Sequence, residues 1–264
     1  MNLWGRASEM GYFNSSECRP SPAFAVQGLV SELHSDLDPG ADAKRVGAIQ
    51  FADRTSHFDA ASVLVNKMYS WRGYGDDHEV MQDPSRITLM AAEGAAVVGT
   101  MSVGIDAADT SLTADQLFKE ELDAHRAAGA RLCELTKLAV EPSARSKFTL
   151  ASLFHFALVY ARDVHACTDA IMEVNPRHRG FYQRMLGFRQ TCEARTNLSV
   201  NAPACLMHIR IEHVSMQVLQ HGGTAARTSS TVSRSFYEFF HSPEDETDIL
   251  DCLRTESAFG CAGA

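Results

Sequence analysis

The chain alternates between strand-type and helix-type segments from residue 46 to residue 211, and this order constrains its fold most strongly. Apolar or alternating runs predict strands at residues 46–51, 87–92, 96–105, 132–140, 170–174, 188–200 and 205–211. Apolar residues at helical spacing predict helices at residues 55–72, 113–127, 146–163 and 178–186. Connections are short at Gly94 and near Pro203, so the strands that they join should be antiparallel. The order predicts an α/β fold of the α+β type, with three layers and a mixed, mostly antiparallel sheet flanked by helices.

The two ends of the chain differ from this central region. Residues 1–44 contain several prolines and are interpreted as a partly ordered N-terminal arm. Residues 45–213 form the predicted domain, in which a capping box at residues 113–116 opens one helix. Residues 214–264 are interpreted as a linker rich in Gly, Ser and Thr and a short C-terminal helix that docks by its aromatic end.

Composition excludes several classes of protein. The 264 residues include 24 Lys and Arg against 33 Asp and Glu, a formal charge of −9, which argues against a general nucleic-acid binder. No apolar run approaches the roughly 18–20 residues of a membrane span, and the first residues lack the apolar stretch of a secretory signal, so we expect a cytoplasmic protein. The seven cysteines form no C-x-x-C pair and no metal-ligand spacing occurs, so neither a metal nor a redox cofactor is expected.

Two segments resemble a known family. They are Cys-Glu-Leu-Thr-Lys-Leu-Ala-Val at residues 133–140 and Val-Asn-Pro-Arg-His-Arg-Gly-Phe-Tyr-Gln-Arg-Met-Leu-Gly-Phe at residues 174–188. With Gly-Ile-Asp at 104–106 and the helix start at 112–122, they resemble the GNAT acyltransferase superfamily over about residues 45–213. Within it they are most similar to N-acyl amino acid synthases, relatives of the acyl-homoserine-lactone synthases. The resemblance implies a GNAT-like fold and transfer of a medium or long fatty acyl group from an acyl carrier protein thioester to the amine of an amino acid.

Glu134 is the residue that we expect to act as the base. Aminolysis of a thioester needs a neutral amine, and a carboxylate inside an otherwise apolar strand is costly unless it is paired or faces a cleft. A buried salt bridge without chemistry is the alternative. The tetrahedral oxyanion needs a preorganised donor, and the resemblance implies a backbone N–H near Lys137 and Leu138.

Tyr182 is the residue that the resemblance places near the leaving sulfur as a proton donor. Such enzymes commonly carry this tyrosine four residues before a Gly-Phe pair, whereas Tyr182 lies five residues before Gly187. One additional residue rotates a helical side chain by about 100°. A role as a core or acyl-tunnel aromatic therefore stays open beside the catalytic one.

The segment from Arg145 to Ala151 indicates the kind of acyl donor. CoA-dependent relatives have glycines here, which let backbone N–H groups approach the diphosphate, but this chain has none between Gly129 and Gly180. The bulky segment argues against a CoA cradle and agrees with the single phosphate of acyl-phosphopantetheine on a carrier protein, so no separate cofactor is expected. The predicted donor-binding residues are Leu138, Val140, Arg145, Lys147, Phe148, Thr149, Asn175 and Phe181.

Two further groups of residues are candidates for binding the acceptor and the carrier. The resemblance implies that the helix at 55–72 covers the acceptor side, with candidate residues Tyr69, Trp71, Arg72 and Asp106, although an aspartate in a turn also explains Asp106. Carrier proteins are acidic, so we expect docking at Arg177, Arg179 and Arg184, with Arg189 nearby. A merely solvated helix face is the alternative.

Two other functions remain compatible with the sequence. An acyl-homoserine-lactone synthase-like enzyme would need a site for S-adenosylmethionine. A non-catalytic GNAT-like module would bind an acyl carrier or a lipid without turnover. Substitution of Glu134 would separate this last alternative from the enzyme, because ligand binding would survive the loss of a base.

Overall fold

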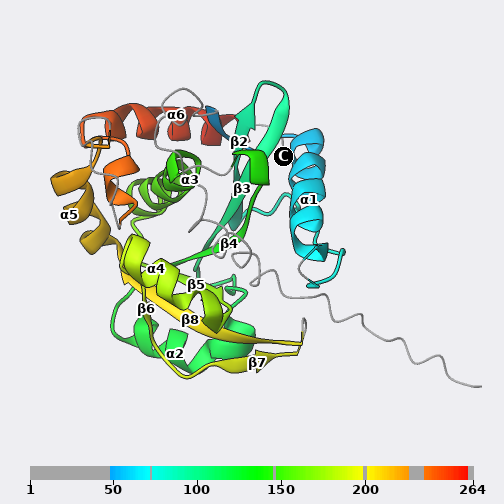
Figure 1. Ribbon diagram of the computed structural model, residues 1–264. Coiled ribbons are helices and arrows are strands. Elements are labelled where there is room, and N and C mark those ends of the chain that lie inside the picture. The colour runs from blue at the N-terminus through cyan, green and yellow to red at the C-terminus, as the bar shows by residue number, and fades with distance from the viewer. Residues whose placement is uncertain (1–47, 72, 145–146, 199–200, 226–234, 261–264) are drawn as a thin grey trace, which may run out of the picture.

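The structure is a computed structural model that describes residues 48–71, 73–144, 147–198, 201–225 and 235–260 (Figure 1). Its centre is an eight-stranded sheet in the order β1-β2-β3-β4-β5-β8-β6, with β7 paired to β8. The strands are β1 (Ala48–Phe51), β2 (Arg86–Glu93), β3 (Ala96–Ile105), β4 (Leu132–Val140), β5 (Asp169–Val174), β6 (Arg189–Gln190), β7 (Arg195–Asn197) and β8 (Ala202–Arg210). Only β4 and β5 pair in parallel, which confirms the predicted mixed, mostly antiparallel sheet.

Helices cover both faces of the sheet (Figure 1). They are α1 (Thr55–Ser70), α2 (Asp115–Ala127), α3 (Lys147–Val159), α4 (Arg179–Leu186), α5 (Ile211–His221) and α6 (Asp245–Gly260). One face carries α1 and α2, each over its own apolar cluster. The other carries α3 and α4 and holds the largest core. We therefore confirm the three-layer architecture.

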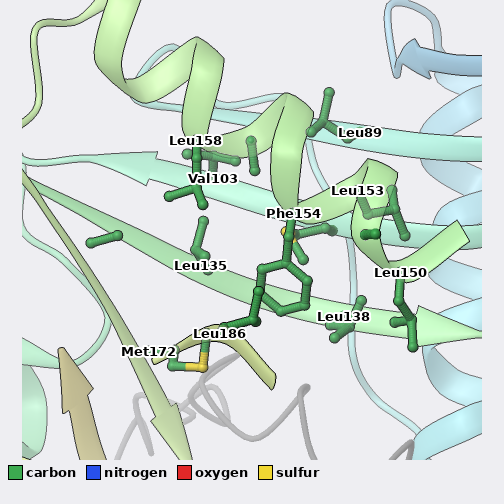
Figure 2. Close-up of a cluster of buried hydrophobic side chains, with 14 of the residues drawn as sticks. Leu89, Val103, Leu135, Leu138, Leu150, Leu153, Phe154, Leu158, Met172 and Leu186 are labelled. Atoms are coloured by element: carbon green, nitrogen blue, oxygen red, sulfur yellow. The ribbon is translucent and has the colours of Figure 1, made fainter. Parts of the chain in front are cut away.

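The apolar side chains of α3 fill the centre of this larger core. Leu150, Leu153, Phe154 and Leu158 point toward β2, β3 and β4, as Figure 2 shows. Almost every position of α3 is buried, because the sheet covers one side of the helix and the C-terminal segment covers the other.

The C-terminal region departs from the predicted linker. Residues 211–221 form helix α5, which buries Val214 and Val218, so the linker interpretation was wrong for residues 214–221. Part of the Ser- and Thr-rich segment, residues 226–234, lies outside the described residues, as does the predicted N-terminal arm. A short 3₁₀ turn (Tyr237–Phe239) and α6 follow and dock on α3 through aromatic side chains, as the sequence predicts.

Strands β4 and β5 separate soon after they pair. Their pairing covers only Leu132–Glu134 against Asp169–Ile171. Beyond it, β4 contains a bulge: Thr100 of β3 pairs with Ala139 and Ser102 pairs with Thr136, so Lys137 and Leu138 face a single residue. Lys137 adopts a φ of +50°, a conformation that side chains other than glycine rarely take. Figure 2 shows Phe154 lying between Leu138 of β4 and Leu186 of α4, on the core side of the separated strands.

Two predicted elements differ in their bounds. The expected strand at 188–200 is broken into β6 and β7, which pair with different parts of β8. The expected helix at 146–163 ends as an α-helix at Val159 and continues as a π-helical turn, Tyr160–Val164. Helix α4 ends where predicted, at Gly187, whose φ is +82°. Within the described ranges, no helix combines the length and apolar composition needed to cross a bilayer.

Candidate active site

A charged side chain crosses the sheet beside the β4 bulge. Arg86 of β2 pairs in register with Gly104 of β3, and Gly104 pairs with Glu134 of β4. Arg86 Nη2 reaches over β3 and lies 3.3 Å from Glu134 Oε2. A Cβ atom on Gly104 would lie only 2.8 Å from Arg86 Nη2. Glycine at this position therefore leaves the space that the guanidinium occupies.

The Glu134 carboxylate is fully buried and accepts hydrogen bonds at both oxygens. The Thr113 N–H donates to Oε2 at 2.8 Å and the Ala114 N–H donates to Oε1 at 2.9 Å. These N–H groups precede α2, which has no side-chain cap of its own. The carboxylate of β4 therefore caps α2 from another element. The predicted capping box was wrong, because the Thr113 hydroxyl instead accepts from Arg86 Nη2 at 3.1 Å.

This environment changes the expected role of Glu134. Both of its oxygens are already engaged, by Arg86 and by two backbone N–H groups. The geometry matches the alternative, a buried salt bridge, rather than a base with an oxygen left to accept a proton. We therefore interpret Glu134 as a positioning residue that fixes α2 against β4.

The loop between α1 and β2 lies over Lys137. Lys137 is 8% exposed, and its Nζ donates to the Glu79 carbonyl. Burial, and then the positive charge of Arg86, lower the pKa of Lys137 to about 8. Asn66 of α1 anchors the loop: its Oδ1 accepts from the His78 N–H at 2.7 Å and its Nδ2 donates to the His78 carbonyl at 3.1 Å. The mostly exposed loop thus encloses the Lys137 side chain at the bulge.

The predicted donor-side residues divide between the core and the start of α3. Leu138, Val140, Phe181 and Tyr182 are buried in the largest core, and Tyr182 is fully enclosed beside Phe181, with ring centroids 5.1 Å apart. This position agrees with the core alternative for Tyr182.

At the start of α3, Phe148 packs edge-to-face on Phe239 at 5.0 Å. Lys147 Nζ lies 5.3 Å from the centroid of that same ring. Thr149 is buried, and Arg145 lies outside the described residues. Asn175 follows β5, and its Oδ1 accepts from the Arg177 N–H at 3.2 Å, so it caps the turn before α4.

The predicted acceptor residues do not come together. Tyr69 is buried against His78, with ring centroids 4.7 Å apart, whereas Trp71 is 66% exposed and Arg72 lies outside the described residues. Asp106 accepts two hydrogen bonds from Arg126, at 2.7 and 2.9 Å. The structure therefore places Asp106 in an ion pair with Arg126 of α2, a partner that neither the acceptor role nor the turn alternative had predicted.

The predicted carrier-docking arginines lie in the turn before α4, at its first residue and in its last turn. Arg177, Arg179 and Arg184 are all exposed. Arg177 Nη2 donates to the Tyr74 hydroxyl at 2.8 Å, and Arg179 Nη1 donates to Gln190 Oε1 at 2.8 Å. Within the described part of the chain, neither Arg177 nor Arg179 forms an ion pair with a carboxylate. Their charge is therefore available to an acidic partner.

Sequence reasoning missed Glu173 of β5. Glu173 is 1% exposed, and its Oε1 accepts from Asn197 Nδ2 of β7 at 2.9 Å. Burial raises the pKa of Glu173 to about 7; the hydrogen bond from Asn197 opposes that rise and the negative charge of Glu134 adds to it. The signal was a carboxylate inside an apolar strand, the same signal that pointed to Glu134.

Comparisons with known proteins agree with this fold. The model of the family "N-acyl amino acid synthase FeeM" matches residues 60–210. The solved structure of FeeM, an N-acyl amino acid synthase from uncultured soil microbes, is 29% identical, covers 62% of this chain and 92% of its own, and has a TM-score of 0.58. An acyl-CoA N-acyltransferase from Pseudomonas aeruginosa is 15% identical over 61% of this chain and 97% of its own, with a TM-score of 0.42. The AHL synthase LasI is 13% identical over 62% and 89%, with a TM-score of 0.46. No curated protein sequence matches the chain.

The sheet with its separated β4 and β5, flanked by helices on both faces, is the GNAT-like fold that the sequence predicts, and the FeeM structure shares it. More specifically, the match over residues 60–210 spans more than half of the sequence, and the chain belongs to the FeeM family of N-acyl amino acid synthases.

Proposed function

We propose that the enzyme transfers a medium or long fatty acyl group from the phosphopantetheine thioester of an acyl carrier protein to the amine of an amino acid. The observation that carries the reaction is the separation of β4 from β5 at the Lys137 bulge. Because β5 pairs with β4 only as far as Glu134, the later part of β4 is left without a β5 partner. A thioester aligned along this part of β4 would place its carbonyl near the backbone N–H groups of Lys137 and Leu138.

The residues around the bulge support such a reaction. Arg86 holds both Glu134 and Thr136, donating to Thr136 Oγ1 at 2.8 Å, and so fixes the strand on the acceptor-side face. Lys137 places a cation against the same region. Buried, preorganised donors stabilise a developing oxyanion better than water does, because they need not reorganise during the reaction.

Two features support a carrier protein as the donor. The start of α3 has no glycine, and Phe148 and Lys147 are packed on Phe239 of the C-terminal segment. This arrangement favours a donor with one phosphate over one with a diphosphate. The exposed arginines of α4 and of the turn before it supply the charge that an acidic carrier would meet.

The experiment is a transfer assay with two donors. The purified protein is incubated with dodecanoyl-acyl carrier protein or dodecanoyl-CoA and a mixture of the amino acids, and the products are identified by mass spectrometry. We expect N-dodecanoyl amino acids, with kcat/KM for the carrier thioester at least about tenfold above that for the CoA thioester, a difference of about 1.4 kcal/mol. Equal or faster transfer from the CoA thioester would contradict the proposed donor, and products other than N-acyl amino acids would contradict the proposed acceptor.

A further inference from the structure

Glu173 has a free carboxylate oxygen in the interior of the protein. Its Oε2 has no hydrogen-bond partner among the described residues, although Oε1 accepts from Asn197. The contrast with Glu134 is direct, because both oxygens of Glu134 are satisfied. An unsatisfied polar group in the interior costs roughly 1–3 kcal/mol of folding free energy, and more when it is charged. Folding alone therefore does not account for a glutamate at this position.

The position of Glu173 in the sheet relates this oxygen to the strand separation. β4 and β5 pair for the last time at Glu134 and Ile171. Side chains alternate along a strand, so Glu173 lies on the same face as Ile171 and is the first residue of that face beyond the last pair. Met172 and Val174 point the other way, into the core with α3 and α4. Glu173 thus belongs to the face of β5 that is covered by α2 and by the loop between α1 and β2.

The charged and titratable groups around Glu173 come from three strands. Glu134 of β4 adds a negative charge, which Arg86 of β2 partly balances. Cys205 of β8 lies close enough for the Glu173 charge to help raise the pKa of its thiol, although burial is the larger cause. Asn197 of β7 is neutral and fixes Oε1, so Oε2 is the oxygen that is left to exchange a proton.

We propose that Glu173 is the general base of the acyl transfer, a role in which Oε2 accepts a proton from the attacking amine. The inference rests on the proposed transfer to an amine. The neutral amine forms the C–N bond to the thioester carbonyl, and its nitrogen becomes acidic as that bond forms. Glu173 takes this proton, the C–S bond breaks, and the proton leaves Glu173 for the departing thiolate. The products are an amide and a thiol, and no oxidant or reductant is consumed.

A base of this kind is efficient because its proton affinity lies near the working pH. The raised pKa of about 7 makes Glu173 a far better acceptor than an exposed carboxylate near pH 4. Glu134 lacks the free oxygen that this step needs. The two glutamates therefore have different roles: Glu134 positions α2, and Glu173 transfers the proton.

The test compares Glu173→Gln with wild type in steady-state assays across pH 5.5 to 9. The donor is whichever thioester, carrier or CoA, supports turnover of the wild type, so failure of the carrier as donor leaves this test intact. We expect kcat to fall about 100-fold, the rising limb of the kcat profile near pH 7 to disappear, and the thermal midpoint to stay unchanged or rise. Glu173→Asp should recover part of kcat together with the limb. Asp169→Asn, on the same strand, is the matched control and should retain kcat within about threefold.

Three results would overturn the proposal. One is a Glu173→Gln variant with kcat within threefold of wild type. Another is a variant that loses activity but keeps the rising limb, because a merely structural role would leave that limb in place. The third comes from a measurement that works even if no donor supports turnover. In protein labelled with ¹³C at the glutamate side chains, we expect one carboxyl resonance that titrates near pH 7. It should disappear in Glu173→Gln and shift when N-dodecanoyl-glycine is added. A spectrum without that resonance removes Glu173 as the base.

Discussion

Arg86 of β2 and Glu134 of β4 form an ion pair across an intervening strand, 3.3 Å apart at Nη2 and Oε2, because Gly104 of β3 has no side chain between them. The pair joins three strands to the start of α2. Changes at any of these residues should therefore affect stability together.

Replacing Gly104 with alanine should displace Arg86. The new Cβ would lie 2.8 Å from Nη2, and the guanidinium cannot move without weakening its bonds to Thr113, Thr136 and Glu134. We expect a loss of about 1–3 kcal/mol in urea unfolding. In an Arg86→Met background the same change should cost much less, because the clashing group is gone. Equal costs in the two backgrounds would show that Arg86 does not occupy this space.

Neutralising Glu134 should destabilise the protein more than removing the whole pair. Glu134→Gln leaves the guanidinium of Arg86, only 14% exposed, without its carboxylate. Breaking a buried pair in this way costs about 3–5 kcal/mol, measured by urea unfolding. The double variant Glu134→Gln with Arg86→Met should recover part of that loss. A single variant as stable as wild type would contradict the structural role that we assign to Glu134.

Stability should fall in acid through Glu246 of α6. Burial alone would raise the pKa of Glu246, but hydrogen bonds from His155 and Arg162, at 2.9 and 2.7 Å, lower it from 4.5 to about 2. Because the folded pKa lies below the unfolded one, the stabilisation is complete above pH 4.5 and is lost as the pH falls toward 2. Between pH 7 and pH 3 this linkage amounts to at most about 2 kcal/mol, because the shift is incomplete at pH 3 and solvent screens a partly exposed group. Urea unfolding at the two pH values should therefore show a larger loss of stability in wild type than in Glu246→Gln.

Replacing Phe240 with alanine should loosen the C-terminal segment from α3. Phe240 is 1% exposed and stacks on His155 with ring centroids 4.7 Å apart. We expect a loss of about 3–5 kcal/mol in urea unfolding, as for other buried aromatic residues. Leu219→Ala is a suitable control, since Leu219 is 73% exposed and should cost less than about 0.5 kcal/mol. Similar costs at the two positions would contradict the docking of this segment.

Charge reversal at Arg179 should weaken transfer from the carrier but not from a small thioester. Arg179 is exposed and has no carboxylate partner among the described residues, so Arg179→Glu would repel an acidic carrier. We expect KM for dodecanoyl-acyl carrier protein to rise about 5–10-fold at low salt, with kcat for dodecanoyl-pantetheine unchanged. Lys119→Glu, at an exposed position of α2, serves as the control. An unchanged KM would place docking elsewhere.

The sequence was sufficient to predict the order of most strands and helices along the chain and the mostly antiparallel character of the sheet. Strands β2, β3 and β4 are largely buried in the sheet, and burial selects apolar residues. These strands therefore carry the hydrophobic pattern from which they were predicted. Gly187 is the kind of residue that ends a helix, because its φ of +82° suits glycine. Helix α5 was missed because it begins directly after β8 and the Gly-, Ser- and Thr-rich segment begins directly after it.

The candidate site was less predictable. The bulge at Lys137 could not be predicted from a glycine, because a lysine adopts the positive φ there. The partners of Glu134 come from β2 and from the turn before α2, and neither spacing nor alternation places these segments together. For the same reason, sequence alone did not distinguish Glu134, whose oxygens are both satisfied, from Glu173, whose Oε2 is not.

The docking of residues 236–253 on α3 has a consequence for folding during synthesis. The ribosome produces the whole region matched by the family before it produces Phe236, Phe240 and Leu253, which close one side of that helix. A nascent chain that has emerged only to residue 213 exposes the apolar surface of α3 to its surroundings, and chaperones bind such surfaces. Synthesis of residues 236–253 therefore completes the packing around α3 and removes that apolar surface from contact with other chains.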